Sequence, residues 1–216
     1  QIAREIAMDD KWKVGRVIAR PYIGTKEGHF TRTSNRHDYA LAPFSKTALD
    51  SLKDAGLDVI GVGKIPDIFV DQGITRKIKT VSNEDGMNKT IELASDNFNG
   101  LAFINLVDFD AVYGHRRNAA GYGKAIEEFD VQLGELINEL KEDDLLIVTA
   151  DHGNDPTYRG TDHTREQVPL IIYSKQFNEM KVLNDGDSFG IIGSTICDNF
   201  NVKYNGIGSS ILKLLK

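Results

Sequence analysis

The chain has little or nothing of the features that mark several classes of protein. Its 216 residues include a single cysteine, Cys197, so no disulfide can form within the chain and nothing calls for an oxidising compartment. No apolar run approaches the roughly 20 residues that span a bilayer. No positively charged and then apolar leader opens the chain. The sequence therefore predicts a cytoplasmic protein with no membrane partner.

Basic residues are also outnumbered by acidic ones, 26 to 32. The net charge is −6, which argues against non-specific binding of nucleic acid, because such binding needs a broad positive surface. The exception is the segment 11–36, which holds seven of the basic residues: Lys11, Lys13, Arg16, Arg20, Lys26, Arg32 and Arg36. This local excess in an acidic chain suits a small anionic ligand better than a polymer.

Hydrophobic patterning indicates the fold. From Pro43 onward, apolar segments with the length of strands, at 57–62, 100–107, 145–150 and 168–173, alternate with helical patterns. The helical patterns cover 45–55, 82–94 and about 126–140. Strands that are apolar on both sides predict an α/β fold, a mainly parallel sheet with helices on both faces. Before Pro43 we expect a strand at 16–20 and a polar loop at 24–38.

Candidate metal ligands follow two of the predicted strands. Asp110 and His115 come after the strand that ends near residue 107, and Asp151 and His152 come after the one that ends at 150. His163 lies in a loop just before the last strand. Ligand sites in open parallel sheets form beyond the carboxyl ends of strands, so these segments should meet. Carboxylates and neutral imidazoles suit Mn, Fe or Zn, with a preference here for Mn or Zn.

Any one of these side chains taken alone is more often a turn residue or a helix cap than a metal ligand. The set is more informative, because it contains three of the five histidines of the chain and places an adjacent aspartate and histidine at a strand end. The clustering predicts a metal site.

Several segments resemble phosphopentomutases of the alkaline phosphatase superfamily. They are Thr-Ser-Asn-Arg-His-Asp-Tyr-Ala at 33–40, Val-Asp-Phe-Asp at 107–110, Tyr-Gly-His-Arg-Arg at 113–117, Thr-Ala-Asp-His-Gly-Asn-Asp at 149–155 and Gly-Thr-Asp-His-Thr-Arg-Glu at 160–166. The Thr-Ala-Asp-His-Gly-Asn element marks the wider superfamily. The Asn-Arg-His-Asp-Tyr-Ala element and the Asp-Phe-Asp and Gly-His-Arg-Arg elements narrow the resemblance to phosphopentomutases.

The resemblance implies an architecture and a ligand set. Residues 1–42 would be the C-terminal part of an inserted α+β cap domain, and residues 43–216 would be most of an alkaline-phosphatase-like core without its N-terminal part. Two divalent ions, with Mn favoured, would bind. One would be held by Asp110, His115 and His163, and the other by Asp151, His152 and an aspartate outside this chain.

The resemblance also implies an activity. Phosphopentomutases are isomerases of nucleoside catabolism that interconvert ribose 1-phosphate and ribose 5-phosphate, and their deoxy analogues, by metal-assisted phosphoryl transfer. The partners would be a small phosphorylated pentose and the missing N-terminal part of the same protein, which would carry the phosphothreonine nucleophile. The chain begins at Gln1 without an initiator methionine, which also suggests a fragment. We therefore expect no catalytic nucleophile among these residues and no activity from this chain alone.

A mutase must hold the distal phosphate of its substrate while the other end reacts. Planar guanidinium groups suit phosphate, and the candidates for substrate binding are Arg16, Arg20, Arg32 and Arg36. Arg116 and Arg117 follow a candidate ligand and could also approach phosphate or be exposed. Asp155 and Asp162 are expected to stabilise loops near the metals instead of binding them.

Two alternatives remain open at the level of sequence. The chain could belong to another enzyme of the same superfamily, a cofactor-independent phosphoglycerate mutase or a phosphatase. It could instead be a non-catalytic module that binds metal or a phosphosugar. Cys197, between apolar residues of a predicted helix, is expected to be a small buried residue.

Overall fold

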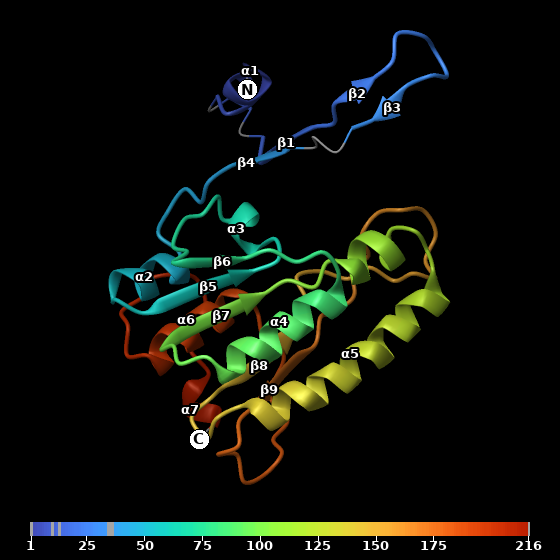
Figure 1. Ribbon diagram of the computed structural model, residues 1–216. Coiled ribbons are helices and arrows are strands. Elements are labelled where there is room, and N and C mark those ends of the chain that lie inside the picture. Colours follow the sequence, from blue (N-terminus) through green and yellow to red (C-terminus); the bar gives the residue numbers. More distant parts are fainter. Residues whose placement is uncertain (1, 10, 13, 34–36, 216) are drawn as a thin grey trace.

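The computed structural model describes residues 2–9, 11, 12, 14–33 and 37–215, and for residues 32, 37 and 38 it describes the backbone alone. The helices are α1 Ile2–Ala7, α2 Ala48–Asp54, α3 Ile65–Ile68, α4 Asn83–Ser95, the π-helix η1 Phe109–Gly114, α5 Ala119–Glu139, α6 Gly190–Asn199 and α7 Leu212–Leu215. The strands are β1 Arg16–Ala19, β2 Tyr22–Ile23, β3 Thr31–Arg32, β4 His37–Ala40, β5 Asp58–Val62, β6 Arg76–Ile78, β7 Gly100–Ile104, β8 Leu146–Thr149 and β9 Leu170–Tyr173 (Figure 1).

The core is built on a parallel sheet in the order β6-β5-β7. Alternate side chains of β5 point to opposite faces, as strand geometry requires. Val59 packs in one cluster with Leu52 of α2 and Cys197 of α6, whereas Ile60 packs in another with Leu93 of α4. Both faces of the sheet are therefore covered by helices, which confirms the predicted α/β fold with a mainly parallel sheet. Helix α5 lies against α4 on the outside (Figure 1).

Strands β8 and β9 form a separate antiparallel pair, with Leu146 opposite Tyr173 and Thr149 opposite Leu170. The strands predicted at 145–150 and 168–173 are confirmed. Their antiparallel pairing has a simple cause. A parallel connection needs a crossover element, and the segment between β8 and β9 contains no helix. It is instead a loop that turns back on itself and carries His163.

The N-terminal segment extends away from the core (Figure 1). The strand predicted at 16–20 is confirmed as β1, which pairs antiparallel with β4. The polar loop predicted at 24–38 is partly wrong, because β3 and the start of β4 lie inside it. Backbone pairing with distant strands creates these short strands, and it needs no apolar period in the sequence. The division into cap and core at residue 42 stays a prediction.

The start of helix α4 is hydrogen-bonded to the segment that follows β7. The Ser82 hydroxyl accepts a hydrogen bond from the backbone N–H of Asp85 at 3.1 Å and caps the helix. Asn83 and Asp108 exchange two hydrogen bonds, each from a backbone N–H of one residue to the side-chain oxygen of the other, at 2.8 and 2.9 Å. This pairing fixes the segment that leads into η1. Among the described residues, no helix combines the length and apolar character needed to cross a membrane.

Candidate metal centre

Three separate segments bring the predicted ligands to one place. The chain leaves β7 and enters η1, which carries Asp110 in its first turn and is followed at its C-cap by His115. The segment after β8 carries Asp151 and His152. The following loop closes on itself through an antiparallel bridge between Gly153 and Thr164. His152 and His163 each precede one of the bridged residues, so the closure of the loop brings them together.

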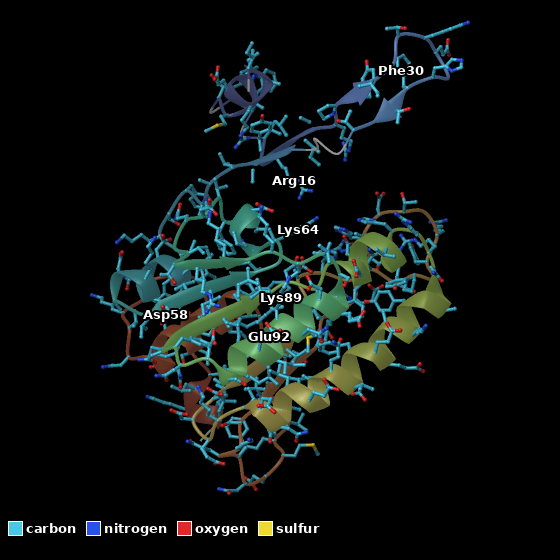
Figure 2. All side chains as sticks on the ribbon, viewed as in Figure 1. Arg16, Phe30, Asp58, Lys64, Lys89 and Glu92 are labelled. Carbon is cyan, nitrogen blue, oxygen red and sulfur yellow. The ribbon has the colours of Figure 1, made fainter. Side chains whose placement is uncertain are left out.

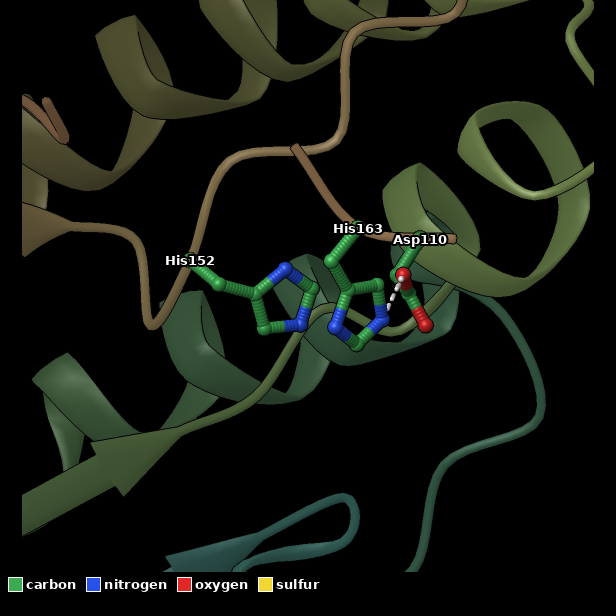
Figure 3. Close-up of side chains that lie close together, drawn as sticks. All are labelled: Asp110, His152 and His163. Carbon is green, nitrogen blue, oxygen red and sulfur yellow. Dashed lines mark ion pairs between the residues drawn. The ribbon is translucent and has the colours of Figure 1, made fainter. Parts of the chain in front are cut away.

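The imidazole rings stack as a result. The centroids of the His152 and His163 rings lie 3.6 Å apart, and those of His115 and His163 lie 4.8 Å apart. Figure 3 shows the His152 and His163 rings side by side, with the Asp110 carboxylate at the far edge of His163. The three histidines therefore form a row that ends against one carboxylate.

Three atoms in this row form a nearly equilateral triangle. Asp110 Oδ1 lies 3.3 Å from His115 Nε2 and 3.2 Å from His163 Nε2. The two Nε2 atoms are 3.2 Å apart. Oxygen and nitrogen ligands sit about 2.0–2.2 Å from a divalent ion, so neighbouring ligands of one ion are about 3.0–3.4 Å from each other. The donor set and its spacing both fit a single divalent cation.

The hydrogen bonds of two histidines set the tautomer that a metal needs. His115 Nδ1 lies 2.6 Å from the carbonyl oxygen of Thr161. A carbonyl oxygen can only accept, so Nδ1 donates, and in the neutral imidazole this leaves the lone pair of Nε2 toward Asp110 and His163. His152 Nδ1 lies 3.1 Å from the carbonyl of Gly153, which has the same effect. These contacts orient the rings for binding through Nε2.

A second candidate position lies beside the first. Asp151 Oδ2 is 3.6 Å from His152 Nε2, and the Asp151 side chain is 74% exposed. His152 also belongs to a looser group with Asp110 and His163, whose ligand atoms lie within 4.8 Å of one another. The structure thus brings Asp110, His115, His152 and His163 together, with Asp151 beside His152.

An amide and a guanidinium group hold this cluster, and sequence reasoning gave neither a specific role. Asn154, which is 9% exposed, donates a 2.7 Å hydrogen bond from Nδ2 to Asp110 Oδ1. Its Oδ1 accepts a 2.8 Å bond from Arg117 Nη1. Asn154 immediately follows the Asp-His-Gly element in the sequence, which is the one signal that could have found it. Arg117 bonds protein groups, so the expectation that it approaches phosphate gains no support from its contacts.

Of the two aspartates expected to stabilise loops, Asp155 does so through its side chain, whereas Asp162 contributes a backbone carbonyl that any residue would supply. Asp155 Oδ1 accepts hydrogen bonds from the backbone N–H and the hydroxyl of Thr157, both at 2.7 Å. These bonds, together with the charge of Arg117, hold the pKa of Asp155 below its ordinary value. Asp162 takes part through its backbone carbonyl, which accepts from Arg117 Nη2 at 2.5 Å.

Tyr122 is a second titratable group near the cluster whose pKa is shifted. Burial raises the pKa of this phenol, and the negative charge of Asp110 raises it further. The Tyr122 ring packs against Phe109 of η1, with centroids 5.6 Å apart. The phenol therefore stays protonated at neutral pH and forms part of the wall behind Asp110.

The predicted substrate-binding arginines are only partly described. Arg16 and Arg20 are exposed on and just after β1. Arg36 and the side chain of Arg32 lie outside the described residues. Figure 2 places Arg16 between β1 and the core, on the side of Lys64.

A groove of about 630 Å³ opens at the C-terminal ends of β5 and β6 and reaches Asp108, two residues before a candidate ligand. Its lining is of mixed charge, with three lysines and three aspartates: Lys64, Lys77, Lys79, Asp67, Asp71 and Asp108. Lys77 is paired with Asp71 at 2.6 Å. The groove therefore joins a surface of mixed charge, on which Lys64 and Lys79 are exposed, to the approach to the metal centre.

Comparison with known proteins identifies the family. Residues 19–204 match the model of the metalloenzyme superfamily. The chain is 59% identical over 217 residues to a protein named phosphopentomutase from Clostridium botulinum (strain Alaska E43 / Type E3), an alignment that covers 100% of this chain and 55% of that protein.

Two further proteins of the same name, from Clostridium beijerinckii and Clostridium tetani, are 58% and 56% identical, again over the whole chain and 55% and 54% of their own lengths. The chain spans about half the length of these relatives. The resemblance noted in the motifs is confirmed, and the chain belongs to the metalloenzyme superfamily.

Proposed function

We propose that this chain forms the metal-holding part of a phosphopentomutase, which interconverts ribose 1-phosphate and ribose 5-phosphate or their deoxy analogues. The observation that carries the proposal is the triangle of Asp110 Oδ1, His115 Nε2 and His163 Nε2, with edges of 3.2–3.3 Å. The relatives named phosphopentomutase supply the substrate class, because they match the chain along its whole length. We keep residues 1–42 as part of a cap domain and 43–216 as core.

We propose two metal positions. Asp110, His115 and His163 would hold one ion, and Asp151 with His152 would contribute to the second. Mn is favoured because the set mixes carboxylate oxygens with imidazole nitrogens. Divalent ions at such a site neutralise the charge of a phosphoryl group in transfer and align the entering and leaving oxygens.

The residues of this chain prepare that chemistry in two ways. Carbonyl groups of Thr161 and Gly153 hold the histidines in the tautomer with a free Nε2, and the Asn154 amide holds the Asp110 carboxylate in place. Lysine side chains in the mixed-charge lining of the groove, above all Lys64 and Lys79, together with Arg16 and Arg20 on the N-terminal segment, would hold the phosphate of the sugar.

A coupled assay tests the proposal in the complete protein that the gene encodes. We expect conversion of ribose 1-phosphate to ribose 5-phosphate that depends on added Mn²⁺ and is lost in Asp110→Asn. Turnover of 3-phosphoglycerate or simple hydrolysis of phosphate monoesters, without conversion of the pentose, would assign the chain to another enzyme of the superfamily. Metal binding without any turnover would favour a non-catalytic module. The same assay on the 216-residue chain tests the expectation that it is inactive alone. A cytoplasmic location and a role in nucleoside catabolism stay predictions.

A further inference from the structure

Arg117 has an unusual backbone conformation and a side chain with many hydrogen bonds, and its place in the sequence predicts neither. It lies three residues beyond the end of η1, and its φ is +52°, in the left-handed region that residues other than glycine rarely adopt. A non-glycine residue keeps this conformation only where its surroundings hold it. The surroundings of Arg117 are therefore expected to contain the interactions that hold it.

The guanidinium makes five hydrogen-bond contacts, all to neutral oxygen atoms. Nε donates to the carbonyl of Gly160 at 2.5 Å, and Nη2 donates to that of Asp162 at 2.5 Å. Nη1 approaches the carbonyls of Gly114 at 3.2 Å and Asp155 at 2.8 Å, as well as the side-chain oxygen of Asn154 at 2.8 Å. All three nitrogen atoms of the guanidinium group therefore donate hydrogen bonds.

These contacts reach each segment that supplies a ligand. The bond to Asn154 fixes the amide that in turn donates to Asp110. The bonds to Gly160 and Asp162 fix the residues on either side of Thr161, whose carbonyl orients the His115 ring. His163 follows Asp162 directly in the same loop.

The charge of Arg117 cannot be what helps a metal bind. A guanidinium cation repels a divalent cation, so any favourable effect on affinity has to come from geometry. Lysine offers one point of donation on a flexible stem, whereas arginine offers five donors in a fixed plane. The observed pattern, in which three nitrogen atoms donate to acceptors at once, requires the planar guanidinium group of arginine.

We propose that Arg117 is a positioning residue that sets the affinity and coordination geometry of the metal centre by holding residues 154–162 against the end of η1. The inference rests on the proposed metal site and adds to it a determinant that touches neither metal nor substrate. Groups that orient metal ligands typically change metal affinity 10–100-fold when they are removed.

The test uses the complete protein and the variants Arg117→Met and Arg117→Lys. Arg116→Met is the matched control, because Arg116 is the adjacent residue, carries the same charge and is exposed. The dissociation constant for Mn²⁺ is measured by the electron paramagnetic resonance signal of free Mn²⁺, at a temperature where the metal-free proteins are folded. The visible absorption of bound Co²⁺ then reports coordination geometry.

We expect both Arg117 variants to bind Mn²⁺ about 10–100-fold more weakly and to show an altered Co²⁺ spectrum. Arg116→Met should stay within about twofold of the parent, because simple loss of positive charge would strengthen binding slightly. Full rescue by Arg117→Lys would mean that charge alone suffices, and would overturn the proposal. Unchanged affinity in both folded variants would overturn it as well.

The outcomes separate this inference from the proposed function. If the parent protein binds no Mn²⁺, the proposed metal site itself is wrong. If the parent binds it and folded Arg117→Met binds it equally well, only the positioning role is wrong. Where Arg117→Met does not fold, Arg117→Lys carries the test, and loss of folding in both variants would assign Arg117 to structural stability alone and contradict the proposal.

Discussion

Gly114 lies where a single added methyl group should disturb the metal centre without touching a ligand. It is buried at the end of η1, and a Cβ built there would lie 2.4 Å from Asn154 Nδ2 and 2.6 Å from Asn154 Cγ. Its φ lies outside the left-handed region, so alanine meets no backbone strain at this position. The Asn154 side chain would have to move, and its bonds to Asp110 and Arg117 would be stretched or broken.

The expected cost follows from these contacts. A hydrogen bond with a charged partner contributes about 1.5–3 kcal/mol, and an extra carbon in a packed site typically costs about 1–3 kcal/mol. Replacing glycine by alanine in a helix returns about 0.5–1 kcal/mol. We therefore expect Gly114→Ala to lower the free energy of unfolding by about 2–4 kcal/mol. Gly123→Ala is the matched control, since Gly123 lies in α5 with nothing within 4 Å of its added Cβ.

Urea unfolding with and without Mn²⁺ separates packing from metal binding. A site that is 100-fold above its dissociation constant adds about 2.7 kcal/mol to the free energy of unfolding. The parent and Gly123→Ala should both gain this increment, while Gly114→Ala should lose most of it in addition to its lower stability without metal. If Gly114→Ala keeps both the stability and the Mn²⁺ increment of Gly123→Ala, Asn154 does not hold the site as described.

Three further predictions concern the core and its titratable groups. Leu52→Ala, at a fully buried position of α2, should lower the free energy of unfolding by about 2–5 kcal/mol, measured by urea denaturation. Burial opposes ionisation of Asp50, but hydrogen bonds from Gln72 and Thr47 outweigh it and hold the pKa of Asp50 below its ordinary value. A carboxyl group with a lowered pKa stabilises the folded state at pH values above its ordinary pKa, and this stabilisation is lost as the pH falls below about 4. Asp50→Asn should therefore make the free energy of unfolding fall less steeply with decreasing pH in the acid range. A curve for Asp50→Asn that runs parallel to that of the parent would contradict this. Burial raises the pKa of Cys197, so a thiol reagent at neutral pH should label it only after unfolding, and rapid labelling of the native protein would refute its burial.

The convergence of the ligands could be predicted because it depends on strand ends. Strand β5, with four consecutive buried residues, has the apolar character of a strand covered on both faces. Asp110 and Asp151 each follow an apolar strand, and the rule that ligand sites lie beyond the carboxyl ends of strands led to the right place. The rule did not show that β7 and β8 belong to different sheets, because the apolar pattern of a strand does not specify its partner.

The supporting interactions could not be predicted, for a different physical reason. Arg117 binds backbone carbonyls, which every residue possesses, so the sequence of residues 155–162 carries no mark of the contact. The pairing of β1 with β4 depends likewise on backbone hydrogen bonds between segments about twenty residues apart along the chain. Polar segments of this kind show neither the helical nor the strand period on which sequence reasoning depends.

The central claim is that Asp110, His115 and His163 hold a divalent ion, and bound metal measures it directly. The complete protein, loaded with Mn²⁺ and dialysed, is compared with His163→Ala and with His29→Ala, a control that removes an exposed histidine far along the chain from the site. Elemental analysis of bound Mn should give the same content for the parent and His29→Ala and a loss of at least one ion per chain for His163→Ala. Equal metal content in all three proteins would contradict the assignment of the site.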